Sequence, residues 1–282
     1  MDGKKLMRRA RLYAPHLPGD IIKLAVVLAF VFPFYWMVAT SFKSYDETLL
    51  FPPTLVPQVF TLEGYLTLFK KMNLFIYAKN SVLVTAATLA LQTVIMIPAA
   101  YAFALYDFKG KGLMFSLVLV AFMIPSQITF ITVYLMMAKW KLLGTLLPQI
   151  IPFAANAFGI FLLRQAFMQV PMEIIESARL DNASEGKIMF GVMLPMCKST
   201  MVTITLFSFI SHWNSYFWPM VMTNSEAIRP LTIAIEKLKD VEYGIHWNLV
   251  MAGNVALVAP ILVVFVFASK RIIEAFAYKG VK

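Results

Sequence analysis

A dense group of ionisable side chains lies in the segment 171–195, in a chain that is otherwise strongly apolar. These side chains are Glu173, Glu176, Arg179, Asp181, Glu185 and Lys187. Each charge would cost about 2.5–3.5 kcal/mol in hydrocarbon, so the segment is expected outside the membrane core. Its chemistry is ion pairing and hydrogen bonding. Two interpretations follow: a docking element for a soluble partner, or an ordinary solvated loop.

The same segment predicts a short helix at its start. Pro171 suits a first helical position, and Glu173 then lies in the first turn, where the helix dipole favours a negative charge. An apolar stripe at helical spacing continues along this helix through Ile174, Ile175 and Ala178. A short helix with one apolar face is therefore expected to pack against something.

A corner and a second helix are predicted to follow. Asp181 and Asn182 form a turn signal, and Asn tolerates the left-handed conformation that ends many helices. Asn182 followed by Glu185 resembles a capping box, which would start a second helix. Two helices joined by a sharp corner would make an ordered element.

A second polar group lies inside an apolar run near residues 199–222, where Thr205, Ser208 and Ser215 recur at helical spacing. Hydroxyl, imidazole and amide groups beside aromatic rings suit a path for a sugar. The candidate residues for this path are Ser211, His212, Asn214, Ser215 and Tyr216. The alternative is that such side chains join packed helices, which is common in membranes. Hydrogen bonding between helices is also the expectation for Gln92, Gln127, Asn156 and Asn254.

Other chemistry is not indicated by the sequence. It contains a single cysteine, no phosphate-binding glycine-rich loop followed by Lys-Ser/Thr, and no paired histidines or cysteines for a metal. No serine motif with a plausible base is present. We therefore predict no catalytic residue, no metal or cofactor on this chain, and no ATP hydrolysis by it. An integral membrane enzyme is disfavoured.

Composition predicts an all-α integral membrane protein. The 282 residues are 60% hydrophobic and 14% charged, far more apolar than a soluble domain. Six uncharged runs are each long enough for a membrane helix, which needs about 20 residues. The predicted spans, within a single domain 1–282, are 21–42, 80–106, 113–138, 142–163, 199–222 and 249–269.

Basic residues predict the orientation. They are more frequent on the side of both termini, which is therefore expected to be cytoplasmic, including the N-terminal segment 1–20. The segment 170–195 then lies in the cytoplasm as well. The net charge of +10 is interpreted as a membrane-surface feature rather than as nucleic-acid binding. On the opposite side a short amphipathic helix is expected near 62–69.

The energy source is expected to lie outside the chain. The uncharged runs contain no acidic residue, whereas proton- or sodium-coupled carriers usually need an intramembrane carboxylate. A self-sufficient secondary carrier or channel for a small polar solute therefore stands only as the alternative to a permease that is driven by another subunit.

The segment 171–195 also resembles a known motif, the "EAA" loop of binding-protein-dependent ABC importer permeases. The matching residues are Glu176-Ser177-Ala178, Asp181-Asn182-Ala183 and Leu194-Pro195. The sequence departs from the motif at Ser177, at Asn182 in place of glycine, and at Ser199 in place of a frequent proline. Asn is a mild replacement where positive φ is needed. The resemblance therefore favours the docking interpretation.

The resemblance extends over nearly the whole chain, to the sugar-importer branch of these permeases and close to the second permease of maltose-type systems. The further matching segments are 61–69, 80–84, 99–103, 108–112, 158–164, 207–219 and 229–233. It implies the type I (MetI-like) fold with six membrane helices, in a bacterial or archaeal cytoplasmic (inner) membrane. The transported carbohydrate, a mono- or oligosaccharide, is not specified.

The family also implies an assembly. A homologous second permease would stand beside this chain, two ABC ATPase subunits carrying ATP and Mg would lie below it, and an extracytoplasmic solute-binding protein would deliver the sugar. In that scheme the coupling loop enters a cleft of one ATPase and transmits its closure to the spans. The implied coupling residues are Glu173, Glu176, Ser177, Ala178, Arg179, Asp181, Asn182 and Ala183. The resemblance does not specify whether the main sugar site lies in this chain or in the second permease.

Overall fold

The structure is a computed structural model that describes residues 17–239 and 244–277. Within these ranges every regular element is a helix. Most of the predicted cytoplasmic segment 1–20 and the last five residues lie outside them. The helical architecture agrees with the predicted all-α membrane fold.

The chain forms two compact units. The first contains the described residues up to Met72 and those of 238–256. Its helices are α2 (Leu17–Ser41), α3 (Tyr45–Thr48), α4 (Glu63–Lys71) and the start of α15 (Trp247–Ala277). A Cβ atom on Gly64 would lie 2.8 Å from the carbonyl oxygen of Asn248, so only glycine permits this close approach of α4 to α15. α4 confirms the amphipathic helix expected near 62–69.

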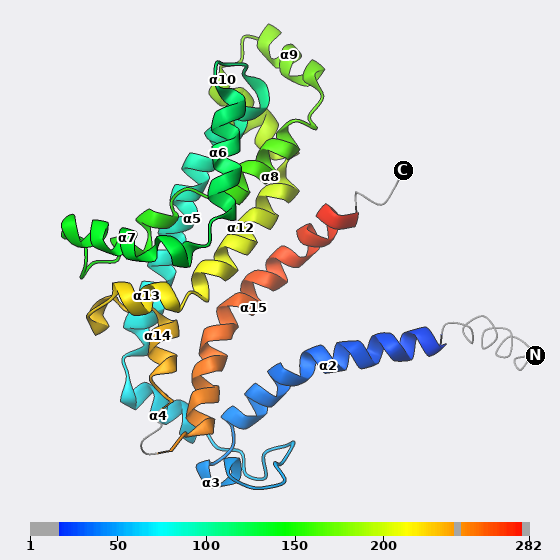
Figure 1. Ribbon diagram of the computed structural model, residues 1–282. Helices are drawn as coiled ribbons and strands as arrows, with labels where there is room; N and C mark the ends of the chain where they lie inside the picture. The colour runs from blue at the N-terminus through cyan, green and yellow to red at the C-terminus, as the bar shows by residue number, and fades with distance from the viewer. Residues whose placement is uncertain (1–16, 240–243, 278–282) are drawn as a thin grey trace, which may run out of the picture. The chain divides into compact units, whose positions relative to one another are not determined.

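The second unit contains residues 73–237 and the chain from Leu257 onward. Its centre is α5 (Leu74–Leu105), which packs against α8 (Ala157–Phe167) and α12 (Lys198–Trp213). α6 (Lys111–Met123) packs on α8 (Figure 1). The remaining helices of this unit are α7 (Ser126–Lys139), η2 (Leu147–Gln149), η3 (Ile151–Phe153), α9 (Met172–Leu180), α10 (Glu185–Lys187), η4 (Ile188–Met193), α11 (Leu194–Met196), α13 (Phe217–Met222), η5 (Glu226–Ile228) and α14 (Leu231–Glu236).

Two of the predicted spans contain a break. Within 113–138, α6 and α7 meet at 98° because Pro125 has no N–H to continue the helical hydrogen bonds. Within 199–222, α12 ends at Trp213 and α13 begins only at Phe217. The segment 185–196 also bends by 82° into α12. Hydropathy alone does not detect such bends.

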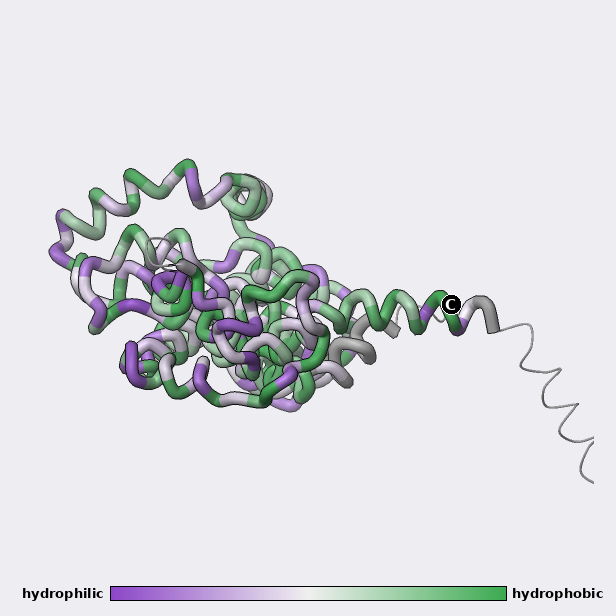
Figure 2. Tube along the Cα trace, turned by 90° about the horizontal axis from the view of Figure 1, so that it is seen from below, coloured by the Kyte–Doolittle hydropathy of each residue, from purple (hydrophilic) through white to green (hydrophobic). Residues whose placement is uncertain are grey.

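In the described residues, four helices are long and apolar enough to cross a membrane, or up to six if each bent pair forms one span. The four are Gly19–Ser41, Leu74–Leu105, Leu147–Phe167 and Trp247–Phe267. Figure 2 shows hydrophobic residues along most of the helical length, with hydrophilic ones mainly at turns and ends. Many large apolar side chains are exposed, which suits contact with lipid or other helices. The six spans and their bounds stay predictions.

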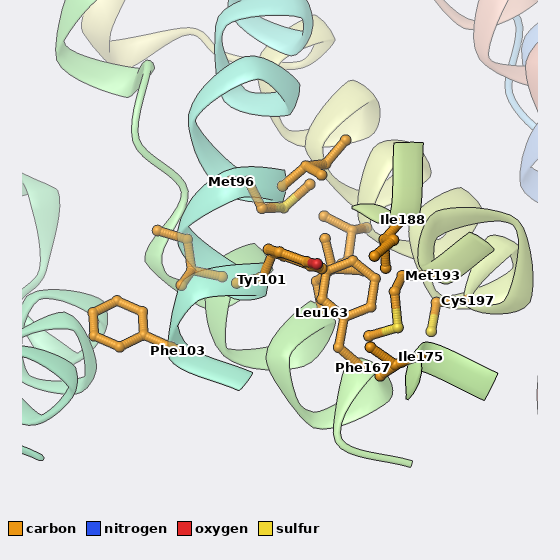
Figure 3. Close-up of a cluster of buried hydrophobic side chains, with 13 residues drawn as sticks. Met96, Tyr101, Phe103, Leu163, Phe167, Ile175, Ile188, Met193 and Cys197 are labelled. Atoms are coloured by element: carbon orange, nitrogen blue, oxygen red, sulfur yellow. The ribbon is translucent and has the colours of Figure 1, made fainter. Parts of the chain in front are cut away.

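A buried cluster joins the bundle to the segment 171–197 (Figure 3). Tyr101 of α5 and Leu163 and Phe167 of α8 meet Ile175 of α9 and Ile188 there. All five side chains are at least nine-tenths buried. The polar segment is therefore anchored on the helices rather than suspended as a free loop.

Candidate functional site

The first candidate site is α9 with the corner that follows it, at one end of the bundle (Figure 1). α9 begins at Met172, so Pro171 is its N-cap rather than its first helical residue, one position earlier in the helix than the sequence predicts, while Glu173 lies in the first turn as expected. Ile175 is only 1% exposed and Ala178 packs against the buried cluster, whereas Ile174 remains exposed. The buried stripe is thus narrower than the sequence suggests, and most of the helix surface is left open.

The corner is closed by a Schellman-type hydrogen-bond pattern. The N–H of Asn182 donates to the carbonyl of Arg179, and the N–H of Ala183 donates to the carbonyl of Ala178, each at 3.0 Å. Asn182 has φ of 55°, the left-handed conformation expected for it. The last carbonyl groups of α9 are therefore satisfied within the segment, and the corner has a defined geometry.

The start of the second helix differs from the prediction. Ser184, rather than Asn182, is the N-cap of α10, and its hydroxyl accepts a hydrogen bond from the Lys187 N–H. Asn182 already belongs to the end of α9, so it cannot also cap the next helix. The predicted capping box was wrong by two residues, while the second helix itself is present as α10, η4 and α11.

Glu185 connects this corner to α5. Its carboxylate accepts a hydrogen bond from the Tyr101 hydroxyl at 2.5 Å and pairs with the Arg179 Nε at 3.1 Å. Hydrogen bonds from Tyr101 and Tyr106, and then from Arg179, lower the pKa of Glu185. The same carboxylate raises the pKa of Arg179. Both charges therefore persist at neutral pH, and α9, α10 and α5 meet at one carboxylate.

This ion pair is partly exposed, with side-chain exposures of 38% for Arg179 and 46% for Glu185. An exposed pair contributes about 1 kcal/mol or less to stability. The pair therefore serves as a link from α9 through Glu185 to Tyr101 of α5, while the buried cluster supplies the packing energy.

The predicted coupling residues occupy two faces of this element. Ala178 and Ala183 are half-buried against the cluster, and Arg179 is turned toward Glu185. The exposed members are Glu173, Glu176, Ser177, Asp181 and Asn182. Leu180, beside them, is 84% exposed. An acidic surface with one prominent leucine, on a helix held from behind, is suited to insertion into a groove of a soluble protein.

The second candidate site is a cavity of about 380 Å³ in the second unit. Its polar lining comes from three parts of the chain: Gln92 of α5, Asn156 before α8, and Ser208, Ser211 and His212 of α12. Aromatic rings complete the wall, namely Phe122, Phe153, Phe158 and Phe207. Polar groups and aromatic faces together are what a hydroxyl-rich solute requires.

Four of the polar residues form a network. The Gln92 amide nitrogen lies 3.0 Å from the His212 Nε2 and donates to the carbonyl of Phe153 at 2.9 Å. The Asn156 amide donates to the Ser208 hydroxyl at 2.9 Å. The same amide group caps α8 by accepting from the Gly159 N–H. These contacts join helices, as expected for Gln92 and Asn156, and they also orient polar atoms at the cavity wall.

The predicted substrate-path residues are therefore divided. Ser211 and His212 line the cavity, whereas Asn214, Ser215 and Tyr216 lie in the break after α12 and are absent from its lining. The Asn214 amide donates to the carbonyl of Ile210 in its own helix at 3.0 Å. The Ser215 carbonyl accepts from the Thr232 hydroxyl at 2.8 Å. In the described structure these polar atoms form hydrogen bonds that hold the backbone at the break.

Sequence reasoning did not identify Tyr101, Tyr106 and Glu185 as a group, or Gln92 as part of a cavity. The signal available was weak: a lone polar residue in an apolar helix shows that a partner is needed, but not which one. Among the residues the structure describes, no three His, Cys, Asp or Glu side chains are grouped so as to hold a metal ion.

Comparison with known proteins gives a consistent picture. Residues 95–277 match the family described as "Binding-protein-dependent transport system inner membrane component". The arabinooligosaccharides transport system permease protein AraQ of Halalkalibacterium halodurans is 29% identical over 255 residues, covering 89% of this chain and 91% of AraQ. The lactose transport system permease protein LacG of Rhizobium radiobacter is 27% identical, with 89% and 90% covered.

A further relative is the sn-glycerol-3-phosphate transport system permease protein UgpE of Brucella abortus, 24% identical over 92% of this chain and 95% of UgpE. Among solved structures, a chain of a bacterial ABC transporter involved in the import of the acidic polysaccharide alginate aligns with a TM-score of 0.81. It is 23% identical, and the match covers 93% of this chain and 97% of that one. This likeness shows a shared fold.

Proposed function

The chain belongs to the family of binding-protein-dependent transport system inner membrane components, and from this premise we propose that it carries a carbohydrate, a mono- or oligosaccharide, into the cytoplasm. It is a permease subunit of an ABC importer, not an enzyme. The proposal of a carbohydrate is supported by relatives named for arabinooligosaccharides and for lactose. The relative named for sn-glycerol 3-phosphate widens the chemistry to hydroxylated solutes in general.

The observation that supports a permease driven by a partner protein is that α9 has one anchored side and one exposed side. Its inner side is fixed by Ile175 and by the carboxylate of Glu185, while Glu173, Glu176 and Leu180 face outward. A solvated loop does not require such anchoring. A rigid element with an open acidic face can instead transmit the movement of a partner into the helices.

The partner of this face is proposed to be one of two ABC ATPase subunits, which would bind ATP and Mg themselves. A homologous second permease would complete the membrane part, and an extracytoplasmic solute-binding protein would supply the sugar. One solved relative of this fold is an alginate ABC transporter in complex with a periplasmic protein that holds an alginate pentasaccharide. In this arrangement both termini and the segment 170–195 are cytoplasmic.

Coupling is proposed to run from α9 through Glu185 to α5. Closure of the ATPase pair would push on the exposed residues, and the link from Arg179 through Glu185 to Tyr101 would carry that movement to the end of α5. α5 packs along α8 and α12, which contribute to the polar cavity. Movement of α9 would thereby change the access of a solute to the cavity, as alternating access requires.

The cavity is the proposed place where a solute passes this subunit. Ser211 and His212 are the proposed contacts, with aromatic rings such as Phe153 beside them. Asn214, Ser215 and Tyr216 are proposed to act at the break after α12, where a change of backbone angle would move the cavity wall. The self-sufficient carrier is not favoured, because members of this family work as subunits of ABC importers.

The test is uptake of labelled sugars by cells that lack this gene. We expect loss of uptake for at least one of arabinooligosaccharides, lactose or a related glycoside, with recovery when the full chain is restored. ATP depletion should abolish the recovered uptake, whereas dissipating the proton gradient at constant ATP should not. Unaltered uptake of every sugar in the deletion strain would contradict the proposal.

A further inference from the structure

An apolar cavity of about 490 Å³ lies within the second unit, along one face of α12. Residues of α5, α11 and α15 complete its wall. It shares no lining residue with the polar cavity, so it is separate from the proposed place of solute passage. Six residues of α12 line it at the spacing of a single helix face, namely Lys198, Met201, Val202, Thr205, Leu206 and Phe209.

This lining carries a charge at one end. Lys198 is the first residue of α12 and, among the described residues that line the cavity, the one ionisable group. It is exposed and belongs to none of the ion pairs found in the described ranges. Beyond Lys198 this face of α12 is apolar apart from Thr205, as far as Phe209. The cavity therefore matches a molecule with an anionic head and an apolar tail.

The length of this face matches one leaflet of a bilayer. Lys198 and Phe209 are eleven residues apart, which is about 16 Å along an α-helix at about 1.5 Å per residue. Half of the hydrocarbon core of a membrane measures about 15 Å. A lysine at the membrane surface would thus stand at the head of an apolar face that ends near the midplane.

We propose that this cavity binds one acyl chain of an anionic phospholipid, whose phosphate bonds the Lys198 ammonium. The ammonium would donate to phosphate oxygens, and the chain would cover Met201, Val202 and Phe209. The proposed orientation puts Lys198 on the cytoplasmic side, where anionic lipids attract basic residues. The inference rests on the proposed function for this orientation alone, since the cavity and its charge belong to the chain itself.

Other occupants fit this lining less well. A membrane helix of a partner needs about 20 residues to cross the hydrocarbon, which is about twice the length of this face. A sugar would lose its hydrogen bonds to water against an apolar wall. A free phosphate would leave the apolar part uncovered. Phosphatidylcholine has the same acyl chains, but its own choline cation offsets the charge of its phosphate.

A bound chain would contact the connection between the coupling loop and α12. Leu194 and Pro195 also line the cavity, in the segment 185–196 that bends by 82° into α12. Leu194 and Met201 pack against the buried cluster that contains Ile175 of α9. The lipid would therefore stabilise this bend and the packing of α9 behind it.

The experiment measures which lipids the full chain retains. The chain is placed in nanodiscs of equal phosphatidylcholine and phosphatidylglycerol with identical acyl chains, extracted in mild detergent and examined by native mass spectrometry. We expect phosphatidylglycerol to be retained about fivefold over phosphatidylcholine, which corresponds to about 1 kcal/mol for one lysine at the surface. Lys198→Gln should abolish this preference. Lys109→Gln removes the same charge from an exposed residue outside the cavity and should preserve it.

Photolabelling locates the bound lipid. Phosphatidylglycerol with a photoreactive acyl chain should label the stretch 198–209, both in the chain alone and in the transporter assembled with the second permease. Val202→Trp fills the cavity with an indole ring and should reduce this labelling severalfold.

A preference that Lys198→Gln removes and Lys109→Gln keeps, with the label on α12, supports the site. Equal retention of the two lipids overturns the inference, as does a preference that survives Lys198→Gln or a label confined to other helices. Loss of the label in the assembled transporter also overturns it, because a partner helix then fills the cavity. If sugar uptake behaves as proposed and the lipid preference is absent, only this inference fails. If the preference depends on Lys198 while deletion leaves every sugar uptake unaltered, only the proposed function fails.

Discussion

Glu226 and Glu185 are held near opposite ends of α5, each by a tyrosine of that helix and by basic side chains of its own segment. Near the start of α5, Tyr77 bonds Glu226, which also pairs with Arg229 at 2.5 Å and with Lys237. Near its end, Tyr101 bonds Glu185. Similar chemistry thus fixes a connecting segment at both ends of one helix.

The two segments differ in what remains exposed. After Glu226, residues 231–235 are all buried. The backbone before them is held by the Asn80 amide, which donates to the carbonyl of Ala227 at 2.8 Å, and by the Gln149 amide, which donates to that of Ile228 at 3.1 Å. α9, in contrast, buries Ile175 and leaves Leu180 84% exposed.

This difference in exposure indicates which of the two segments is available to a partner protein. The segment around Glu226 runs into the buried residues 231–235 and is bonded to Asn80 and Gln149, so its polar contacts serve stability. The segment around Glu185 is anchored by Ile175 and by the Glu185 carboxylate, whereas Glu173, Glu176 and Leu180 of α9 are exposed in the described structure. We infer that the second segment is built to receive force from another protein, and the following experiments are designed to break or sharpen that contrast.

The largest expected effect comes from Glu176→Lys on the exposed face of α9. Reversal of this charge should reduce ATP-dependent uptake more than tenfold, because the face proposed to meet the ATPase is altered while the anchoring residues are not. Membrane insertion, measured by protease protection, should be unchanged. Glu63→Lys on α4 is the control and should transport normally. Normal uptake by Glu176→Lys would remove α9 from the coupling path.

A matched pair of substitutions separates the two sides of α9. Ile175→Ala should destabilise the chain by about 2–4 kcal/mol, since it opens a hole in the buried cluster. Leu180→Ala should change stability by less than about 0.5 kcal/mol, because the side chain is exposed. Thermal unfolding in detergent measures both. Leu180→Ala should instead weaken binding of the ATPase subunit, and equal destabilisation by the two variants would argue against a two-sided helix.

The corner itself is tested at Asn182. Asn182→Gly should be nearly neutral because glycine adopts positive φ freely, whereas Asn182→Val should cost about 1–2 kcal/mol. Uptake should fall with the valine variant only. Equal behaviour of the two variants would mean that the left-handed turn does not matter for coupling.

The smallest effect is a pH dependence in the segment around Glu226. Hydrogen bonds from Lys237 and Tyr77 lower the pKa of Glu226 to about 2. A carboxyl whose pKa is lowered on folding stabilises the protein above its unfolded pKa and loses that contribution as pH falls through the folded one. The melting difference between wild type and Glu226→Gln should therefore be constant from pH 7 to about 5 and shrink toward pH 2. A difference that grows on acidification would contradict the assignment.

Much of this organisation could be predicted from the sequence. Charge density marked 171–195, and the tolerance of Asn for positive φ placed the corner at Asn182. The cap at Ser184 was missed because Asn182 and Ser184 are both good N-cap residues, and only the backbone path shows which one α9 already uses. The contact of Glu185 with Tyr101 spans 84 residues, so it depends on packing that local patterns do not encode.

The bends in the helices were not predicted for a similar reason. Hydropathy adds up side-chain properties over a window, whereas a bend such as the 82° one between 185–196 and α12 is a change of backbone direction that leaves those sums unaltered. Pro125 gave a signal for the bend at α7, but proline is also frequent in continuous membrane helices. The polar cavity could likewise not be predicted from the sequence, because Gln92, Asn156 and His212 come together only in the folded structure.

The most direct test of the central claim is transport by purified components in liposomes, with a sugar that the intact cells take up. We predict that the full chain alone carries none of it, and that uptake begins only when the second permease, the ATPase subunits, the binding protein and ATP are all present. Accumulation of the sugar by liposomes that contain this chain alone, without ATP, would contradict the account.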